Sequence, residues 1–141
     1  MNSVILQIAS KYIKWILVLF ALIALYRGHN YPGGGFIGGL LFSMSVIFYS
    51  FAFDGPTAKN VIKIKPEGFI ALGLLLIFLS LFPGLILNQI FMAGVWISIA
   101  IPLLGDIKLG TPFLFDIGVF LAVIGVTLRL FFSLNRVAKW K

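Results

Sequence analysis

The chain has 141 residues, of which 61% are hydrophobic and 11% are charged, whereas about a quarter of the residues of a typical soluble domain are charged. It has no cysteine and one histidine, which excludes disulfides and thiolate ligands and argues against a metal site. Its net charge of +7 comes from basic residues that flank apolar segments, a pattern of membrane topology and not of nucleic-acid binding. We therefore expect an integral membrane protein that lies in the lipid bilayer, with no cofactor, no metal and no nucleic-acid partner.

Four apolar segments have about the length, roughly 20 helical residues, that crosses a hydrocarbon core of about 30 Å. The chain is therefore expected to be all-α, with four transmembrane helices in a single membrane domain, residues 1–141. The predicted helices cover approximately residues 4–26, 36–53, 68–87 and 112–134. The first resembles a signal peptide, but no small-x-small cleavage site follows it, so we expect a retained helix.

The first two helices are joined by RGHNYPGGGFIGGL, residues 27–40, the most polar and most glycine-rich stretch of the chain. Its glycine spacing matches neither common phosphate-binding motif, so a nucleotide site is not expected. Gly34 with Gly38, and Gly35 with Gly39, form two overlapping G-x-x-x-G pairs, which are typical of close helix packing. We interpret the stretch as an assembly turn whose glycine faces accept a helix of a neighbouring subunit. Its turn and packing residues are Pro32, Gly33, Gly34, Gly35, Phe36, Gly38 and Gly39.

Two polar residues of this turn, His29 and Asn30, allow two interpretations. A histidine that titrates near neutral pH can relay protons, and an asparagine oxygen can bind a sodium ion. Alternatively, both residues lie at the level of the lipid headgroups and line a polar pocket, where polar side chains cost little. The second interpretation is favoured on chemistry alone, and both residues remain candidates for an ion path.

The connection between the third and fourth helices contains a further apolar stretch, IFMAGVWISIAIPLL at residues 90–104. It is shorter than a comfortable span and contains Pro102, which favours an interfacial or re-entrant segment over a crossing helix. Charge supports this choice, because a fifth span would distribute the basic residues almost evenly between the two sides.

With four spans, nine of the 11 basic residues share the side of the two termini, and Arg27 and Lys108 lie on the other. The nine are Lys11, Lys14, Lys59, Lys63, Lys65, Arg129, Arg136, Lys139 and Lys141. Because cytoplasmic loops carry an excess of Lys and Arg, we expect both termini in the cytoplasm.

Asp116 is the one acid that falls clearly inside a predicted span, about one turn into the last helix. A carboxylate there could cap the free N–H groups of a helix start or serve as another structural partner, or it could belong to an ion path. The structural interpretation is favoured. The sequence offers no nucleophile with a base beside it and no pair of acids on one helix face, so we expect no enzyme activity.

Two blocks of the sequence resemble a known family. GHNYPGGGFIGGL, together with LGTPFLFDIGVFLAVIGVTL at residues 109–128, is similar to the MnhB/MrpB family of subunits of Mrp-type multisubunit Na⁺/H⁺ antiporters. The resemblance implies an accessory subunit of a hetero-oligomeric complex in a prokaryotic inner (plasma) membrane. It implies large subunits related to those of respiratory complex I, together with small accessory subunits, as partners, and Na⁺ and H⁺ as the ions that the complex transports.

Two alternatives remain open. An equivalent MnhB-type subunit occurs in archaeal membrane-bound hydrogenases and related respiratory complexes, and this chain alone does not distinguish the assemblies. A self-contained homo-oligomeric channel would need a continuous polar stripe along at least one helix, which these segments nearly lack.

Overall fold

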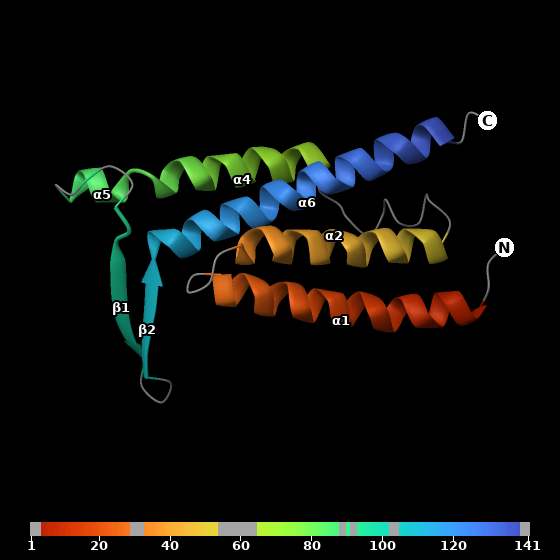
Figure 1. The fold of residues 1–141 in the computed structure, drawn as a ribbon, viewed down its shortest axis with the longest axis horizontal. Coiled ribbons are helices and arrows are strands. Elements are labelled where there is room, and N and C mark those ends of the chain that lie inside the picture. Colours follow the sequence, from red (N-terminus) through yellow and green to blue (C-terminus); the bar gives the residue numbers. More distant parts are fainter. Residues whose placement is uncertain are drawn as a thin grey trace.

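The structure, a computed structural model, describes residues 4–28, 33–53, 65–87, 90, 93–101 and 105–138 (Figure 1). Its elements are the helices α1 (Val4–Gly28), α2 (Gly34–Ala52), α4 (Pro66–Ser80), α5 (Pro83–Ile86) and α6 (Thr111–Ala138), and the strands β1 (Trp96–Ile101) and β2 (Gly105–Gly110). Four helical segments are long and apolar enough to cross a membrane, and the third combines α4 with α5. The predicted number of spans is confirmed.

Two prolines determine where the helices of the third span begin. Pro66 opens α4, where a missing N–H group is harmless, and Glu67 follows at the positive end of the helix dipole. The helix is interrupted after Ser80 because Pro83 lacks the N–H group and the space that an uninterrupted helix requires. One further turn, α5, completes the span.

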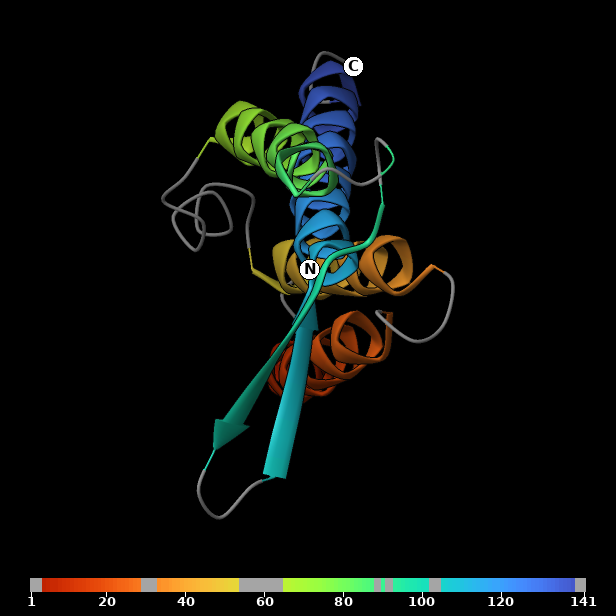
Figure 2. The same ribbon diagram turned by 90° about the vertical axis from the view of Figure 1, so that its left-hand side faces the viewer.

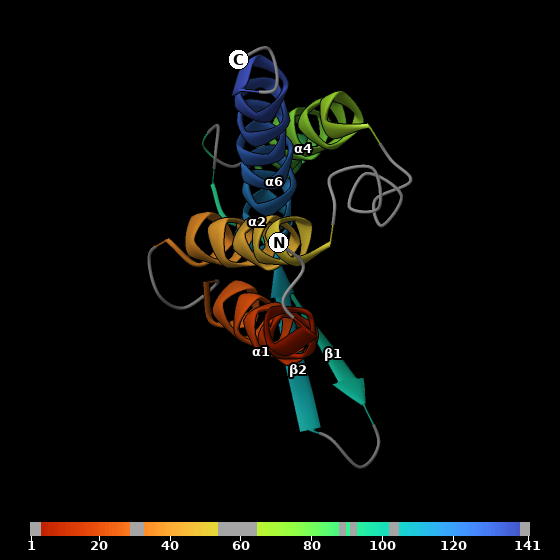
Figure 3. The same cartoon turned by 90° about the vertical axis from the view of Figure 1, so that its right-hand side faces the viewer.

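The four spanning helices lie side by side in the order α1, α2, α6, α4 (Figures 2 and 3). The last helix in the sequence therefore lies between the second and the third. The helices form an open row, with α1 and α4 at its two ends. Large side chains on the outside of the row, such as those of Leu19 and Leu75, are more than half exposed, and in a bilayer they contact lipid or another membrane protein.

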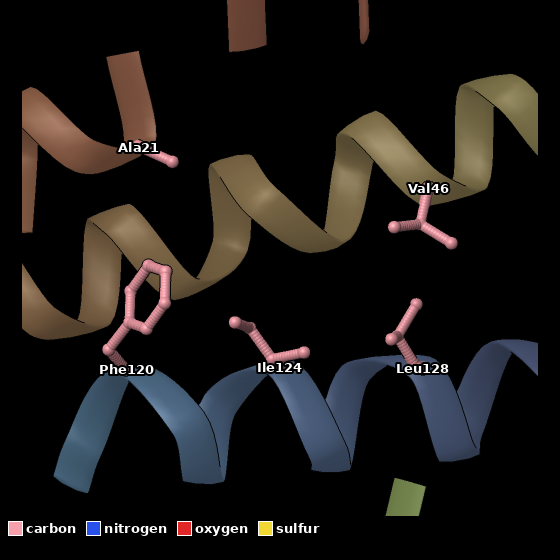
Figure 4. Close-up of a cluster of buried hydrophobic side chains, with 5 residues drawn as sticks. All are labelled: Ala21, Val46, Phe120, Ile124 and Leu128. Atoms are coloured by element: carbon pink, nitrogen blue, oxygen red, sulfur yellow. The ribbon is translucent and has the colours of Figure 1, made fainter. Parts of the chain in front are cut away.

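The buried core lies between α2 and α6, with a contribution from α1 (Figure 4). Phe120, Ile124 and Leu128 follow one another at intervals of four along α6, so they share one face of that helix. They pack with Val46 of α2 and Ala21 of α1. The ring of Phe120 also makes an edge contact with Phe42, with 5.9 Å between the ring centroids.

The connection from α5 to α6 departs from the all-α expectation. The expected interfacial or re-entrant segment at 90–104 contains a strand among its described residues, because β1 pairs with β2 as an antiparallel hairpin at one end of the row. The register pairs Trp96 with Gly110 and Ile99 with Ile107. The physical reason lies in the period of the sequence. Ile97, Ile99 and Ile101 alternate with smaller residues, which is the two-residue period of a strand.

The opposite end of the row carries the start of α1, the end of α2, the start of α4 and the end of α6 (Figure 1). There, Lys11 and Lys14 of α1 extend over aromatic rings at the end of α2. The Lys14 ammonium lies 4.7 Å from the ring centroid of Tyr49, and that of Lys11 lies 5.7 Å from that of Phe53. Such cation–π contacts stabilise charged side chains near the apolar part of a bilayer.

Candidate functional site

The first G-x-x-x-G pair packs against α1 of the same chain. A Cβ atom added at Gly34 would lie 2.5 Å from the carbonyl oxygen of Ala24, and one at Gly38 would lie 2.8 Å from that of Ala21. Real Cβ contacts are longer than this, so no larger residue fits here without a shift of the backbone. Both glycines are buried, and they bring the backbones of α1 and α2 together.

The second pair packs in the same way against α6. A Cβ atom added at Gly35 would collide with the backbone of Asp116, and one at Gly39 would lie 2.8 Å from Cβ of Val123. Both glycine faces of α2 therefore lie close to the backbone of another helix. The expected occupant was wrong, because the chain's own α1 and α6 fill the space assigned to a neighbouring subunit.

Asp116 lies where three helices meet. Its Oδ2 atom is 2.7 Å from the place that a Cβ atom of Gly28 would take, so the missing side chain at the end of α1 makes room for the carboxylate. The first turn of α2 is adjacent, since Gly35 contacts the backbone of Asp116. The carboxylate therefore adds negative charge beside the start of α2, where the helix dipole is positive.

This placement corrects one detail of the prediction for Asp116. Helix α6 begins at Thr111, so Asp116 lies beyond the first turn of α6. In the structural interpretation, Asp116 would instead serve the end of α1 and the start of α2, which meet at Gly28, Gly34 and Gly35. Its alternative role in an ion path stays a prediction.

The centre of the predicted turn is outside the described residues. These are residues 29–32, with His29, Asn30 and Pro32 among them, and their roles stay predictions. The turn's last residue, Gly33, has a φ of 87°, a left-handed conformation that glycine adopts readily. Phe36 follows in the first turn of α2 with a half-exposed ring, so this side chain is available to contact lipid or another protein.

A second glycine seam, between α4 and α6, was not anticipated. A Cβ atom added at Gly73 would lie 2.6 Å from the carbonyl oxygen of Gly118, and one at Gly118 would lie 2.8 Å from that of Gly73. Gly125 continues the seam against the start of α4, 2.6 Å from the carbonyl oxygen of Pro66 by the same measure. The spacing of Gly118, Ala122 and Gly125 could have indicated this face, because small residues three and four apart lie on one side of a helix.

Within the described residues, the fully buried polar side chains are serines. The hydroxyl groups of Ser43, Ser45 and Ser80 each donate to a carbonyl oxygen of their own helix, at 2.6–2.8 Å. Hydroxyls that are satisfied in this way do not form a wet path through the row. No group of histidine and acidic side chains that could hold a metal ion occurs in the described part of the chain. The arrangement therefore suits a packed scaffold, with Asp116 at the junction of α1, α2 and α6.

Comparison with known proteins gives one consistent family. The family model described as "Domain related to MnhB subunit of Na+/H+ antiporter" matches residues 5–129. The chain is 34% identical over 129 residues to the B-type subunit of the Na(+)/H(+) antiporter of Bacillus subtilis, a match that covers 92% of this chain and 90% of that protein. It is 32% identical over 133 residues to the corresponding protein of Alkalihalophilus pseudofirmus, covering 94% and 92%.

A solved structure is similar as well. The structure of the Mrp complex from Dietzia sp. DQ12-45-1b matches with a TM-score of 0.72 and 31% sequence identity over 88% of this chain. The match spans 13% of the length of the chain in that complex. The arrangement of the helices is thus shared with a part of a longer chain in a larger membrane assembly.

Proposed function

Because this chain belongs to the family of the MnhB subunit of Na⁺/H⁺ antiporters, we propose that it is an accessory membrane subunit of a multisubunit antiporter that exchanges Na⁺ for H⁺. It is a multi-pass membrane protein and part of a transporter, not an enzyme. The observation that carries the proposal is the similarity to two antiporter subunits of this type over at least nine-tenths of their length.

The geometry supports a scaffolding contribution. The four helices are held in a row by close glycine contacts. The buried polar side chains of the described residues are all serines, and hydroxyls such as that of Ser43 donate to a carbonyl oxygen of their own helix. An ion pathway needs groups that can replace water around an ion or a proton. The antiporter's transport steps therefore belong chiefly to other subunits, and this chain positions them.

The strongest candidate for contact with ions is the junction that holds Asp116. We propose that His29 and Asn30, which follow Gly28 directly, line a polar pocket near this carboxylate. The closeness of Gly28 to Oδ2 of Asp116 supports the placement. A histidine in such a pocket would change the pH dependence of exchange, since its charge changes near neutral pH.

The identity of the membrane and the orientation of the chain in it are also proposals. We place the chain in a prokaryotic inner (plasma) membrane with both termini in the cytoplasm. Its support is the charge distribution, with nine of the 11 basic residues on the side of the termini. The helix ends agree with an even number of spans, because the start of α1 and the end of α6 lie at the same end of the row (Figure 1).

The test is removal and isolation of the chain in its own host. Deletion should abolish Na⁺-dependent proton exchange in everted membrane vesicles, and the restored chain should recover it. An affinity-tagged chain, purified in a mild detergent, should bring several different hydrophobic subunits with it. A homo-oligomer alone, with exchange unaffected by the deletion, would contradict the proposal, and co-purified hydrogenase subunits would move the chain to the alternative assembly.

A further inference from the structure

The hairpin of β1 and β2 is fixed to the bundle at its base. The Val95 N–H donates to Oγ1 of Thr111 at 3.2 Å, and the Thr111 N–H donates to the Val95 carbonyl oxygen at 3.0 Å. One residue further, Gly110 leaves room for the ring of Trp96, since an added Cβ atom would lie 2.8 Å from it. The direction of the hairpin is therefore set by the start of α6.

From this base the hairpin crosses the end of the helix row and extends past α1 (Figures 2 and 3). Each strand has six residues, which at about 3.3 Å per residue is roughly 20 Å of reach. Among the described elements outside the hairpin, the main contact of β2 is with α6, close to the base. The outer part of the hairpin thus projects past α1 and runs across the direction of the helices (Figure 1).

The register divides the hairpin residues into two unlike faces. Cross-strand partners share a face, and successive residues alternate between faces. One face collects the residues Ile97, Ile99, Ile101, Gly105, Ile107 and Leu109. The other collects Trp96, Ser98, Ala100, Asp106, Lys108 and Gly110. One face is thus apolar over the whole length of the hairpin, and a two-stranded hairpin of this kind is marginal without a surface to pack on.

Helix α1, past whose end the hairpin extends, is exposed on its outer side in the described part of the chain. It is an end helix of the row and packs chiefly against α2. Only 11% of its spanning window is buried. Ile16, Leu19 and Ile23, spaced along one side of the helix, are each between 44% and 58% exposed. In Figure 1 the hairpin runs across the direction of α1 and not along it, so the α1 surface and the hairpin face the same space from two sides.

We propose that these two surfaces together hold one membrane-embedded subunit of the assembly, with its helices along α1 and its outer end beneath the apolar face of the hairpin. This inference rests on the proposed function, since it needs a hetero-oligomeric complex. Charge favours a protein over lipid headgroups as the occupant. Asp106 and Lys108 cancel, whereas surface elements that bind anionic lipid carry an excess of Lys or Arg. A protein surface also offers partners to the open edges of a two-stranded hairpin.

Photo-crosslinking in the intact complex tests this. A photoreactive amino acid is placed singly at two test positions, Ile99 in the hairpin and Leu19 on α1. The control position is Leu75 on α4, at the other end of the row, because its side chain is exposed to a similar extent as that of Leu19. After irradiation of native membranes, the tagged chain is purified and its adducts are identified by peptide mass. Positions 99 and 19 should give an adduct with the same subunit, and position 75 should not.

A pair of substitutions adds a quantitative test. Ile99→Asp should lower the amount of that subunit retained on the tagged chain about tenfold, because an unpaired carboxylate would be buried at the contact. Ala100→Asp, one residue away on the opposite face, should leave the amount unchanged. Two outcomes would contradict the shared occupant while leaving the proposed function intact, provided that the complex co-purifies. In one, position 99 gives only lipid adducts; in the other, position 99 crosslinks to a different subunit from position 19. If no complex co-purifies, the proposed function itself fails.

Discussion

At the scale of single residues, the glycines of α2 have a role that differs from that of an exposed docking surface. Gly39 is buried between α2 and α6, and an added Cβ atom would lie 2.8 Å from Cβ of Val123 and 2.9 Å from the carbonyl oxygen of Phe120. A substitution here therefore acts on the fold of this chain first and on its assembly second.

Replacing Gly39 should destabilise the isolated subunit. We expect Gly39→Ala to lower the free energy of unfolding by about 1–3 kcal/mol, since the backbone of α6 must move away from α2. Thermal stability of the purified chain in detergent measures the effect. Gly68→Ala, at an exposed position in the first turn of α4, is the matched control and should be neutral or slightly stabilising. Equal stability of the two variants would contradict the packing role.

Two substitutions of Asp116 separate the effect of its charge from the effect of its shape. Asp116→Asn keeps the size and one acceptor oxygen, so the junction with Gly28 should stay intact and the complex should assemble normally. Asp116→Ala removes the acceptor and leaves space, so the level of assembled complex should fall, with a loss of about 1 kcal/mol in the stability of the chain. Native-gel abundance and Na⁺-dependent exchange in vesicles are measured for both. Normal assembly of the Asn variant without exchange would place the charge in the ion path.

At the scale of the elements, α4 is joined to α6 by two unlike contacts. One is the buried seam of Gly73 and Gly118. The other is an ion pair between Glu67 Oε1 and Arg129 Nη1, 3.0 Å apart, whose side chains are 55% and 59% exposed. Exposed pairs contribute little because water and salt screen them, whereas close backbone packing cannot be replaced by solvent.

The two contacts should therefore differ in their effect on stability. We expect Arg129→Gln to change the free energy of unfolding by less than about 1 kcal/mol, with a smaller change at high salt. Gly73→Leu should separate α4 from α6 and cost several times more. Denaturation of the detergent-solubilised chain at two salt concentrations compares them. A larger loss for Arg129→Gln than for Gly73→Leu would show that the ion pair dominates this contact.

How much could be predicted differs between the elements. Length and apolar content were sufficient for the four spans, because a membrane helix satisfies its own backbone and leaves its signal in local composition. The hairpin was missed because its stability depends on a pairing between residues 96–101 and 105–110, and neither strand indicates its partner by itself. The G-x-x-x-G pairs were found, but their spacing shows only that a backbone comes close. It does not show whether that backbone belongs to the same chain, as it does at Gly34 and Gly35.

At the scale of the whole molecule, the open row gives the subunit two ends that face in opposite directions. One end carries the hairpin and the end of α1 at Gly28. The other carries the starts of α1 and α4, with Lys11 and Lys14 close to aromatic rings. Their orientation in the membrane is a prediction from charge alone and can be tested directly.

Single cysteines in this cysteine-free chain test the orientation. Cysteines at Asn60 and Lys139 should react only with reagents that cross the membrane, because both positions are expected in the cytoplasm. A cysteine at Lys108, in the hairpin, should react with an impermeant thiol reagent added to intact cells. Labelling of Lys139→Cys from outside would reverse the proposed orientation.

The order of the row also has a consequence for biosynthesis. Because α6 lies between α2 and α4, the ribosome delivers α4 before the helix that it packs against exists. The α1–α2 pair can form as soon as both segments have left the translocon, but the glycine face of α4 at Gly73 must wait in lipid until Gly118 arrives. The last segment to be made is therefore the one that unites the other three. A nascent chain that stops before residue 111 would hold one closed helix pair and one helix without its partner, a form that membrane quality control could recognise.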